Sequence, residues 1–77
     1  MIPDRIIGSE FAKKRYARYD GHVVWKFHSE YYGRNIERAY HSDSGNPCGL
    51  YRVQDGLTLI VGENLLGVKA ATRDWVM

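Results

Sequence analysis

Apolar and polar side chains alternate along residues 23–28, directly after the pair Asp20-Gly21. Asp-Gly suits the tight turns of β-hairpins, and residues 13–19 before it are also rich in tyrosine. The pattern predicts a hairpin across residues 13–27 that turns at Asp20-Gly21. Because side chains alternate along a strand, one face of its second strand should be the core side, with Val23, Trp25 and Phe27.

The opposite face of that strand is predicted to be basic. It carries His22, Lys26 and His28, with Val24 as the apolar exception. A basic residue lies opposite Lys26 in both hairpin registers, Arg15 with a two-residue loop and Lys14 with a three-residue loop. Like charges directly opposite each other destabilise a strand pair. Two interpretations stay open, a solvated sheet face or a basic, aromatic-edged surface for nucleic acid or an acidic protein.

A second hairpin is predicted across residues 50–61, around Asp55-Gly56. A three-residue loop at residues 54–56 sorts the apolar side chains of both strands best. It places on one face Tyr51, Val53, Leu57, Leu59 and Val61. Residues 42–49 consist almost wholly of turn-forming residues and predict a loop.

Residues 29–41 fit two patterns. As a helix, the segment is N-capped by Ser29 and has an apolar stripe that runs to Tyr40. As two strands, it turns at residues 33–35, and Ile36 begins a clear alternation. Gly33 lowers helix stability by about 1 kcal/mol, yet we favour the helix.

Candidate helix N-caps indicate possible helices near both ends of the chain. Residues 1–12 predict a short helix or an extended arm, with Asp4 or Ser9 as a candidate N-cap. Residues 64–76 fit either a helix capped by Asn64 or a turn into another strand, and we favour the helix.

Together these elements predict an α+β fold, a small antiparallel sheet built from two β-hairpins with one or two short helices. The 77 residues are expected to form one small domain, residues 1–77. The net charge of +2 is unevenly spread, because residues 1–41 hold eight Lys/Arg and five Asp/Glu, against three and four in residues 42–77. The basic half also holds eight of the ten aromatic residues.

Catalytic and metal-binding patterns are weak. His22 and His28 are separated by about 20 Å at roughly 3.3 Å per strand residue, too far apart to share an ion. His41 and Cys48 flank a loop, but two ligands do not make a structural zinc site. The sequence has no Gly-x-Ser-x-Gly, no phosphate-binding glycine loop and no His-Glu-x-x-His. We expect no metal site, no cofactor and no enzymatic activity.

Compartment is indicated by cysteine usage and hydropathy. Cys48 is the only cysteine, which favours a reducing cytoplasm over secretion. The first residues lack a long apolar run, so we expect no signal peptide, and no segment is apolar enough to cross a membrane. The prediction is a cytoplasmic protein without a membrane partner.

Binding is the class of function that the composition favours. Tyr, Trp and Arg dominate protein interfaces, and cations beside aromatic rings also suit single-stranded nucleic acid. The candidate binding residues are Lys13, Lys14, Arg15, Tyr16, Arg18, Tyr19, Lys26, Tyr31, Arg34 and Arg38.

The first hypothesis is a nucleic-acid-binding module that uses the basic face of the first hairpin, with affinity that falls steeply with salt. The alternative is a small regulator or inhibitor of a partner protein, of the compact kind that mobile genetic elements encode. One form of this alternative is a regulator that blocks a protein which itself handles nucleic acid. Self-association through an uncovered sheet edge is a third hypothesis.

Overall fold

The computed structural model describes residues 4–77. Its elements along the chain are β1 (Arg5–Ile7), α1 (Glu10–Tyr19), β2 (Val23–Tyr31), β3 (Arg34–His41), β4 (Pro47–Asp55), β5 (Thr58–Gly62) and α2 (Leu65–Val76). Residues 1–3 of the predicted N-terminal arm lie outside the described residues. Neither helix of the described part is both long and apolar enough to span a membrane.

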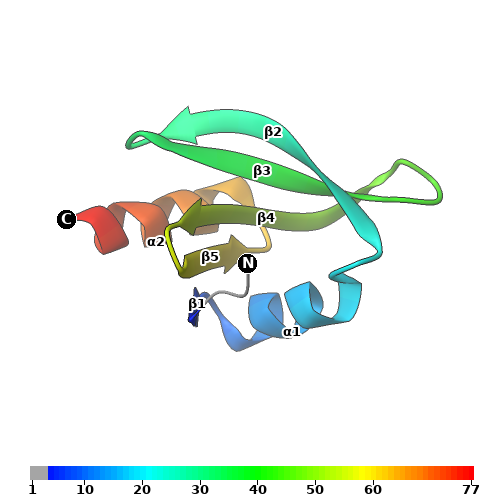
Figure 1. Cartoon of the computed structure of the whole chain (residues 1–77), viewed down its shortest axis with the longest axis horizontal. Coiled ribbons are helices and arrows are strands. Elements are labelled where there is room, and N and C mark those ends of the chain that lie inside the picture. Colours follow the sequence, from blue (N-terminus) through cyan, green and yellow to red (C-terminus); the bar gives the residue numbers. More distant parts are fainter. Residues whose placement is uncertain (1–3) are drawn as a thin grey trace.

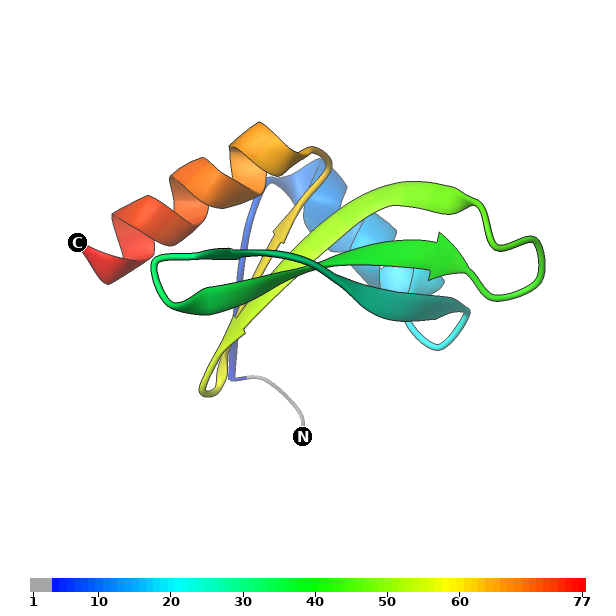
Figure 2. The same cartoon turned by 90° about the horizontal axis from the view of Figure 1, so that it is seen from above.

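The five strands form one sheet in the order β1-β5-β4-β3-β2 (Figure 1). All neighbouring pairs are antiparallel except β1 and β5, which are parallel. The α+β class, with a mostly antiparallel sheet and two helices, is therefore confirmed. The β3–β4 loop projects away from both helices in Figures 1 and 2.

The two helices pack on opposite faces of the sheet. On β5, Leu59 packs with Ala12 of α1, while its neighbour Ile60 packs with Val68 of α2. Successive strand residues point to opposite faces, so each helix has its own layer of core. Strand β5 lies between the two helices and is buried on both sides.

The predicted hairpin at residues 13–27 is wrong in its first half, because residues 13–19 belong to helix α1. The helix begins at the N-cap Ser9, whose hydroxyl accepts a hydrogen bond from the amide of Ala12 at 3.1 Å. Asp20-Gly21 ends the helix instead of turning a hairpin, with Gly21 at a φ of 87°. A left-handed glycine suits a helix C-terminus as well as a tight turn, so the pair alone did not distinguish them.

The second half of that prediction holds in part. Val23 and Trp25 do turn inward on β2, packing toward Ala39 and Leu50 below α1. Phe27, predicted to be core, is 65% exposed. Its place in the strand lies beyond the stretch that α1 covers.

Residues 29–41 form strands, so the favoured helix is wrong and the alternative is right. Strands β2 and β3 make a hairpin through Tyr32 and Gly33, both left-handed, with φ values of 52° and 73°. Two left-handed residues form the primed turn whose twist matches paired strands. The segment's two apolar anchors serve opposite faces, with Ile36 on the α2 side and Ala39 on the α1 side.

The second predicted hairpin is present as β4–β5, but its register differs. Asp55 pairs with Thr58, so the loop is Gly56-Leu57, and Leu57 is 45% exposed instead of buried. Both faces of β5 are covered, and apolar alternation therefore carried no register information there. The predicted loop at residues 42–49 is shorter, because β4 already begins at Pro47.

The predicted C-terminal helix is confirmed as α2. Asn64 is its N-cap, with the side-chain oxygen accepting a hydrogen bond from the amide of Gly67 at 2.7 Å. Val68 and Thr72 face the sheet and are fully buried. The Thr72 hydroxyl is satisfied by the carbonyl of Val68 at 2.7 Å, so burial leaves it with a partner.

Candidate functional site

The structure divides the ten predicted binding residues between two sides of the molecule. Six lie on α1, namely Lys13, Lys14, Arg15, Tyr16, Arg18 and Tyr19. Lys26 and Tyr31 lie on β2, and Arg34 and Arg38 lie on β3. The expected pairing of Arg15 or Lys14 with Lys26 is wrong, because both residues belong to helix α1 and not to a strand beside β2.

Lys26 nevertheless has a basic residue directly opposite, and that residue is Arg38 of β3. Both side chains lie on the α2 side of the sheet, since Arg38 pairs in turn with Tyr51. We call the surface that they share the open basic face, formed by Val24, Lys26, His28, Arg38 and Tyr40, with the buried ring of Tyr51 beneath it. It extends over β2 and β3, and its exposed members, Val24, Lys26 and His28, lie on β2.

Aromatic rings hold the two cations of this face. The Lys26 ammonium lies 5.2 Å from the ring centre of Tyr40, and the Arg38 guanidinium lies 5.8 Å from the same ring. Arg38 also lies 5.4 Å from the ring centre of Tyr51, which His28 meets edge-on at 5.6 Å. Cation–π contacts offset some of the repulsion between the paired charges.

The carboxylate next to Arg38 in the sequence is turned away from the open basic face. Glu37, next to Arg38 on β3, points to the α1 side and bonds Arg52 at 2.8 Å. Arg38 makes no ion pair within residues 4–77, and its Nε is buried without a hydrogen-bond partner there. A buried donor without a partner is costly, and an anion placed on this face would meet a preorganised cation pair.

Most of the open basic face is free of helix cover. Val24 is 47% exposed, and Lys26 and His28 are exposed. Helix α2 meets this hairpin at its turn end, where the Lys69 ammonium lies 5.4 Å from the ring centre of Tyr31. Tyr31 is therefore engaged beside α2 and is not part of the open surface.

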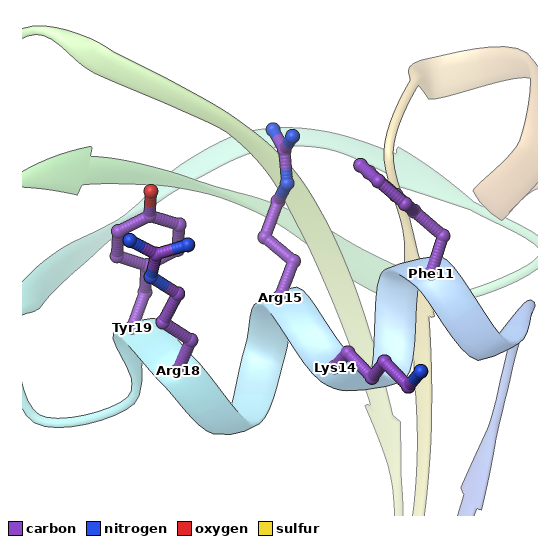
Figure 3. Close-up of a pocket in the computed structure, with 5 residues that line it drawn as sticks. All are labelled: Phe11, Lys14, Arg15, Arg18 and Tyr19. Carbon is purple, nitrogen blue, oxygen red and sulfur yellow. The ribbon is translucent and has the colours of Figure 1, made fainter.

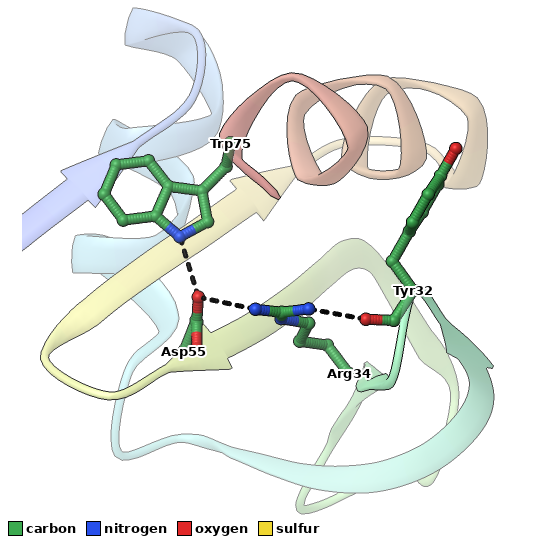
Figure 4. A network of polar contacts seen from close by, with 4 residues as sticks. All are labelled: Tyr32, Arg34, Asp55 and Trp75. Atoms are coloured by element: carbon green, nitrogen blue, oxygen red, sulfur yellow. Dashed lines mark hydrogen bonds and ion pairs between the residues drawn. The ribbon is translucent and has the colours of Figure 1, made fainter. Parts of the chain in front are cut away.

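Arg34 is likewise engaged in structure. Its guanidinium reaches Asp55 at 3.4 Å and the carbonyl of Tyr32 on the hairpin turn (Figure 4). The same Asp55 carboxylate accepts the indole N–H of Trp75 at 2.8 Å. This network fastens the β2–β3 turn and the end of α2 to β4, which removes Arg34 from the free binding residues.

Tyr16 belongs to the core below α1. Its ring centre lies 6.1 Å from that of Trp25, whose ring is covered by the Arg52 guanidinium at 4.3 Å. Burial, with the negative charge of Asp20 as a second cause, raises the pKa of Tyr16. Its hydroxyl therefore stays neutral at physiological pH, as a side chain packed against the sheet requires.

The remaining α1 residues form a second surface, which we call the α1 groove. Its lining is Phe11, Lys14, Arg15, Arg18 and Tyr19, around a hollow of about 190 Å³ (Figure 3). These positions repeat along one flank of the helix. Arg15 donates to the carbonyl of Cys48 at 3.1 Å, which places the groove beside the start of β4.

Cys48 is the candidate nucleophile of the sequence, and it lies in the core beside β3. Cys48 is 8% exposed, and burial raises the pKa of its thiol, so the reactive thiolate is disfavoured. Within residues 4–77 there is no group of three or more His, Cys, Asp or Glu side chains arranged for a metal ion.

Tyr40, Tyr51 and Phe11 are site residues that the sequence analysis did not select. Tyr40 alternates with Arg38 in the strand interpretation of residues 29–41, the alternative to the predicted helix. That interpretation places Tyr40 and Arg38 on one face of a strand, which could then pair with the basic strand of residues 22–28. Phe11 precedes Arg15 by four positions, which places both on one side of a helix. The hairpin prediction for residues 13–27 did not consider this helical spacing.

Comparison of the chain with protein-family models, curated proteins and solved structures finds no significant match to any of them. Function is therefore inferred from the side chains themselves.

Proposed function

We propose that the protein is a non-enzymatic module that binds single-stranded nucleic acid on the open basic face. The observation that carries this proposal is the direct pairing of Lys26 with Arg38 across β2 and β3. A like-charge pair weakens a sheet, so its presence among aromatic side chains favours a surface that an anion completes.

The chemistry of the face matches a single strand better than a duplex. Phosphates meet the two cations, while the rings of Tyr40 and His28 offer surfaces on which bases stack. Base stacking on these rings requires unpaired bases, which a single strand offers and a duplex does not. A cytoplasmic location, supported by the buried unpaired thiol of Cys48, is part of the same proposal.

The test is fluorescence anisotropy with a labelled single-stranded oligonucleotide, as DNA and as RNA, and with the corresponding duplex. The wild-type protein should bind the single strand, with log affinity falling against log salt by about 0.7 for each phosphate contacted. Lys26→Glu should abolish binding at moderate salt. Tyr40→Leu should weaken binding with little change in salt slope, since it removes stacking and keeps the cations.

Arg73→Glu is the matched control, because Arg73 is an exposed cation on α2, outside the open basic face. It changes net charge as much as Lys26→Glu does, and should leave affinity within about twofold. An equal loss of oligonucleotide affinity in the two variants would show that only the net charge of the protein matters. Absence of binding by the wild-type protein at low salt would reject the proposal.

A further inference from the structure

The α1 groove lies on the face of the sheet opposite the open basic face and has no role in the function proposed above. Helix α1 uses Ala12 and Tyr16 to pack on the sheet. The groove residues lie on the neighbouring flank, where Phe11 is 55% exposed. A large exposed ring in a hollow is a feature of binding surfaces, since a single apolar side chain of a partner can cover it.

The two arginines of the groove are held in place before any ligand arrives. The Arg15 guanidinium lies 4.8 Å from the ring centre of Phe11 while one of its N–H groups donates to the Cys48 carbonyl. The Arg18 guanidinium lies 5.6 Å from the ring centre of Tyr19. Guanidinium groups fixed in this way lose less conformational entropy when they bind a carboxylate.

The groove also lacks its own counterions. Its five lining residues include three cations and no acid. In the part of the chain that the structure describes, the α1 ion pair is Lys13 with Glu10 at 3.9 Å, and Lys14, Arg15 and Arg18 form none. The hollow is therefore lined by the aromatic rings of Phe11 and Tyr19 together with three positive charges.

We propose that the α1 groove docks an acidic peptide segment of a partner protein, with one apolar side chain in the hollow and flanking carboxylates on Arg15 and Arg18. Arginine pairs with carboxylates through two parallel hydrogen bonds, which fixes the orientation of the segment. A nucleic-acid strand suits the groove less well, because the exposed Phe11 ring favours an aliphatic side chain, which a peptide supplies and a nucleic-acid strand lacks. The protein would then join an acidic protein on one side to nucleic acid on the other.

The probe is a fluorescent peptide with a central leucine flanked on both sides by aspartate and glutamate. Two control peptides replace the acids by asparagine and glutamine, or the leucine by glycine. The wild-type protein should bind the acidic leucine peptide at least about tenfold more tightly than either control, because each control removes one half of the recognition.

Variants separate the groove from the open basic face. Lys14→Glu with Arg18→Glu, both at exposed positions, should weaken peptide binding about tenfold or more. Phe11→Ala should weaken it by a similar factor through loss of the apolar contact. Lys26→Glu and Arg73→Glu should leave peptide affinity within about twofold, and circular dichroism confirms that each variant is folded.

Three outcomes would overturn the inference. The first is equal affinity for the acidic and the neutral peptide. The second is full affinity in folded Phe11→Ala protein. The third is a wild-type protein that binds no peptide, together with a Lys14→Glu/Arg18→Glu variant that has lost oligonucleotide binding. That result would assign the groove to nucleic acid. Failure of the peptide test alone leaves the open basic face untouched, because Lys26 and Arg38 lie across the sheet from α1.

Discussion

The indole N–H of Trp75 donates to the carboxylate of Asp55 at 2.8 Å, joining the last turn of α2 to the end of β4. Arg34 shares the same carboxylate oxygen at 3.4 Å. One acidic side chain thus connects three elements that are distant in the sequence. The Trp75 ring is also approached by the Arg5 guanidinium at 5.8 Å, which brings in β1.

This connection predicts a measurable coupling between Trp75 and Asp55. Trp75→Phe and Asp55→Asn should each lower the free energy of unfolding, and a double-mutant cycle should give a coupling of about 1 kcal/mol. A charge-assisted hydrogen bond would be stronger if buried, but both groups are partly exposed here. The measurement is chemical denaturation followed by circular dichroism. Leu66→Gln, at an 80% exposed position of the same helix, serves as the control and should change little.

Gly8 predicts a second, steric effect on stability. A Cβ atom at this position would lie 2.5 Å from the carbonyl oxygen of Val61 and 2.9 Å from its Cγ2. Backbone of β5 cannot move aside without disturbing the sheet, so Gly8→Ala should cost about 1–3 kcal/mol of unfolding free energy. Gly45→Ala is the comparison, because Gly45 has a φ of 76° but nothing within 4 Å.

Gly45→Ala should therefore show only the cost of a left-handed alanine, about 1 kcal/mol. Gly8 also has a positive φ, of 158°, so Gly8→Ala carries backbone strain as well as steric overlap. Thermal unfolding of both variants measures how much stability Gly8→Ala loses beyond the loss in Gly45→Ala. An equal loss in the two would mean that the close approach of Gly8 to Val61 contributes nothing.

Cys48 predicts a pH dependence. Its pKa is raised in the folded state by burial, so the thiol keeps its proton more strongly than in the unfolded chain. Stability from this group is complete below the unfolded value of roughly 8.5 and is lost as pH rises from there through the folded pKa. The unfolding free energy of the wild-type protein should fall above about pH 8.5 more than that of Cys48→Ala does. Alkylation by iodoacetamide at neutral pH should be slow until denaturant is added.

Helix caps were the part of the fold that could be predicted most directly. Ser9 and Asn64 were both identified from the sequence as candidate caps, and each cap makes its bond within its own first turn. Such signals are local and do not depend on tertiary packing. The β4–β5 hairpin at Asp55-Gly56 was found for the same reason, whereas its register depends on two helices that cover both faces.

The site was harder to predict because the hairpin turn is formed by Tyr32-Gly33 and not by Asp20-Gly21, the pair with the stronger turn signal. Asp-Gly is a strong hairpin signal, yet here it ends α1. A left-handed tyrosine is unusual, yet Tyr32 turns the β2–β3 hairpin with support from its carbonyl bond to Arg34 and an edge-on contact with Tyr31 at 4.7 Å. Arg34 is in turn held by Asp55 of β4, a contact that only the tertiary structure provides. The basic face of residues 22–28 was therefore inferred with the wrong partner strand.

The pairing of Lys26 with Arg38 predicts that function and stability oppose each other at position 26. Replacing Lys26 with threonine removes the like-charge repulsion and introduces a residue that favours strands. Lys26→Thr should therefore raise the unfolding free energy by about 0.5 kcal/mol at low salt, while oligonucleotide binding is lost. A merely solvated lysine would give no change in binding.

Salt supplies the internal control for this last prediction. Added salt screens the repulsion, so the stability difference between wild-type and Lys26→Thr protein should shrink as ionic strength rises toward 1 M, where the screening length is about 3 Å. The difference should also reverse when a saturating oligonucleotide is present, because the ligand stabilises only the protein that binds it. A wild-type protein that stays less stable than Lys26→Thr under saturating oligonucleotide would show that the cation pair is not completed by phosphate.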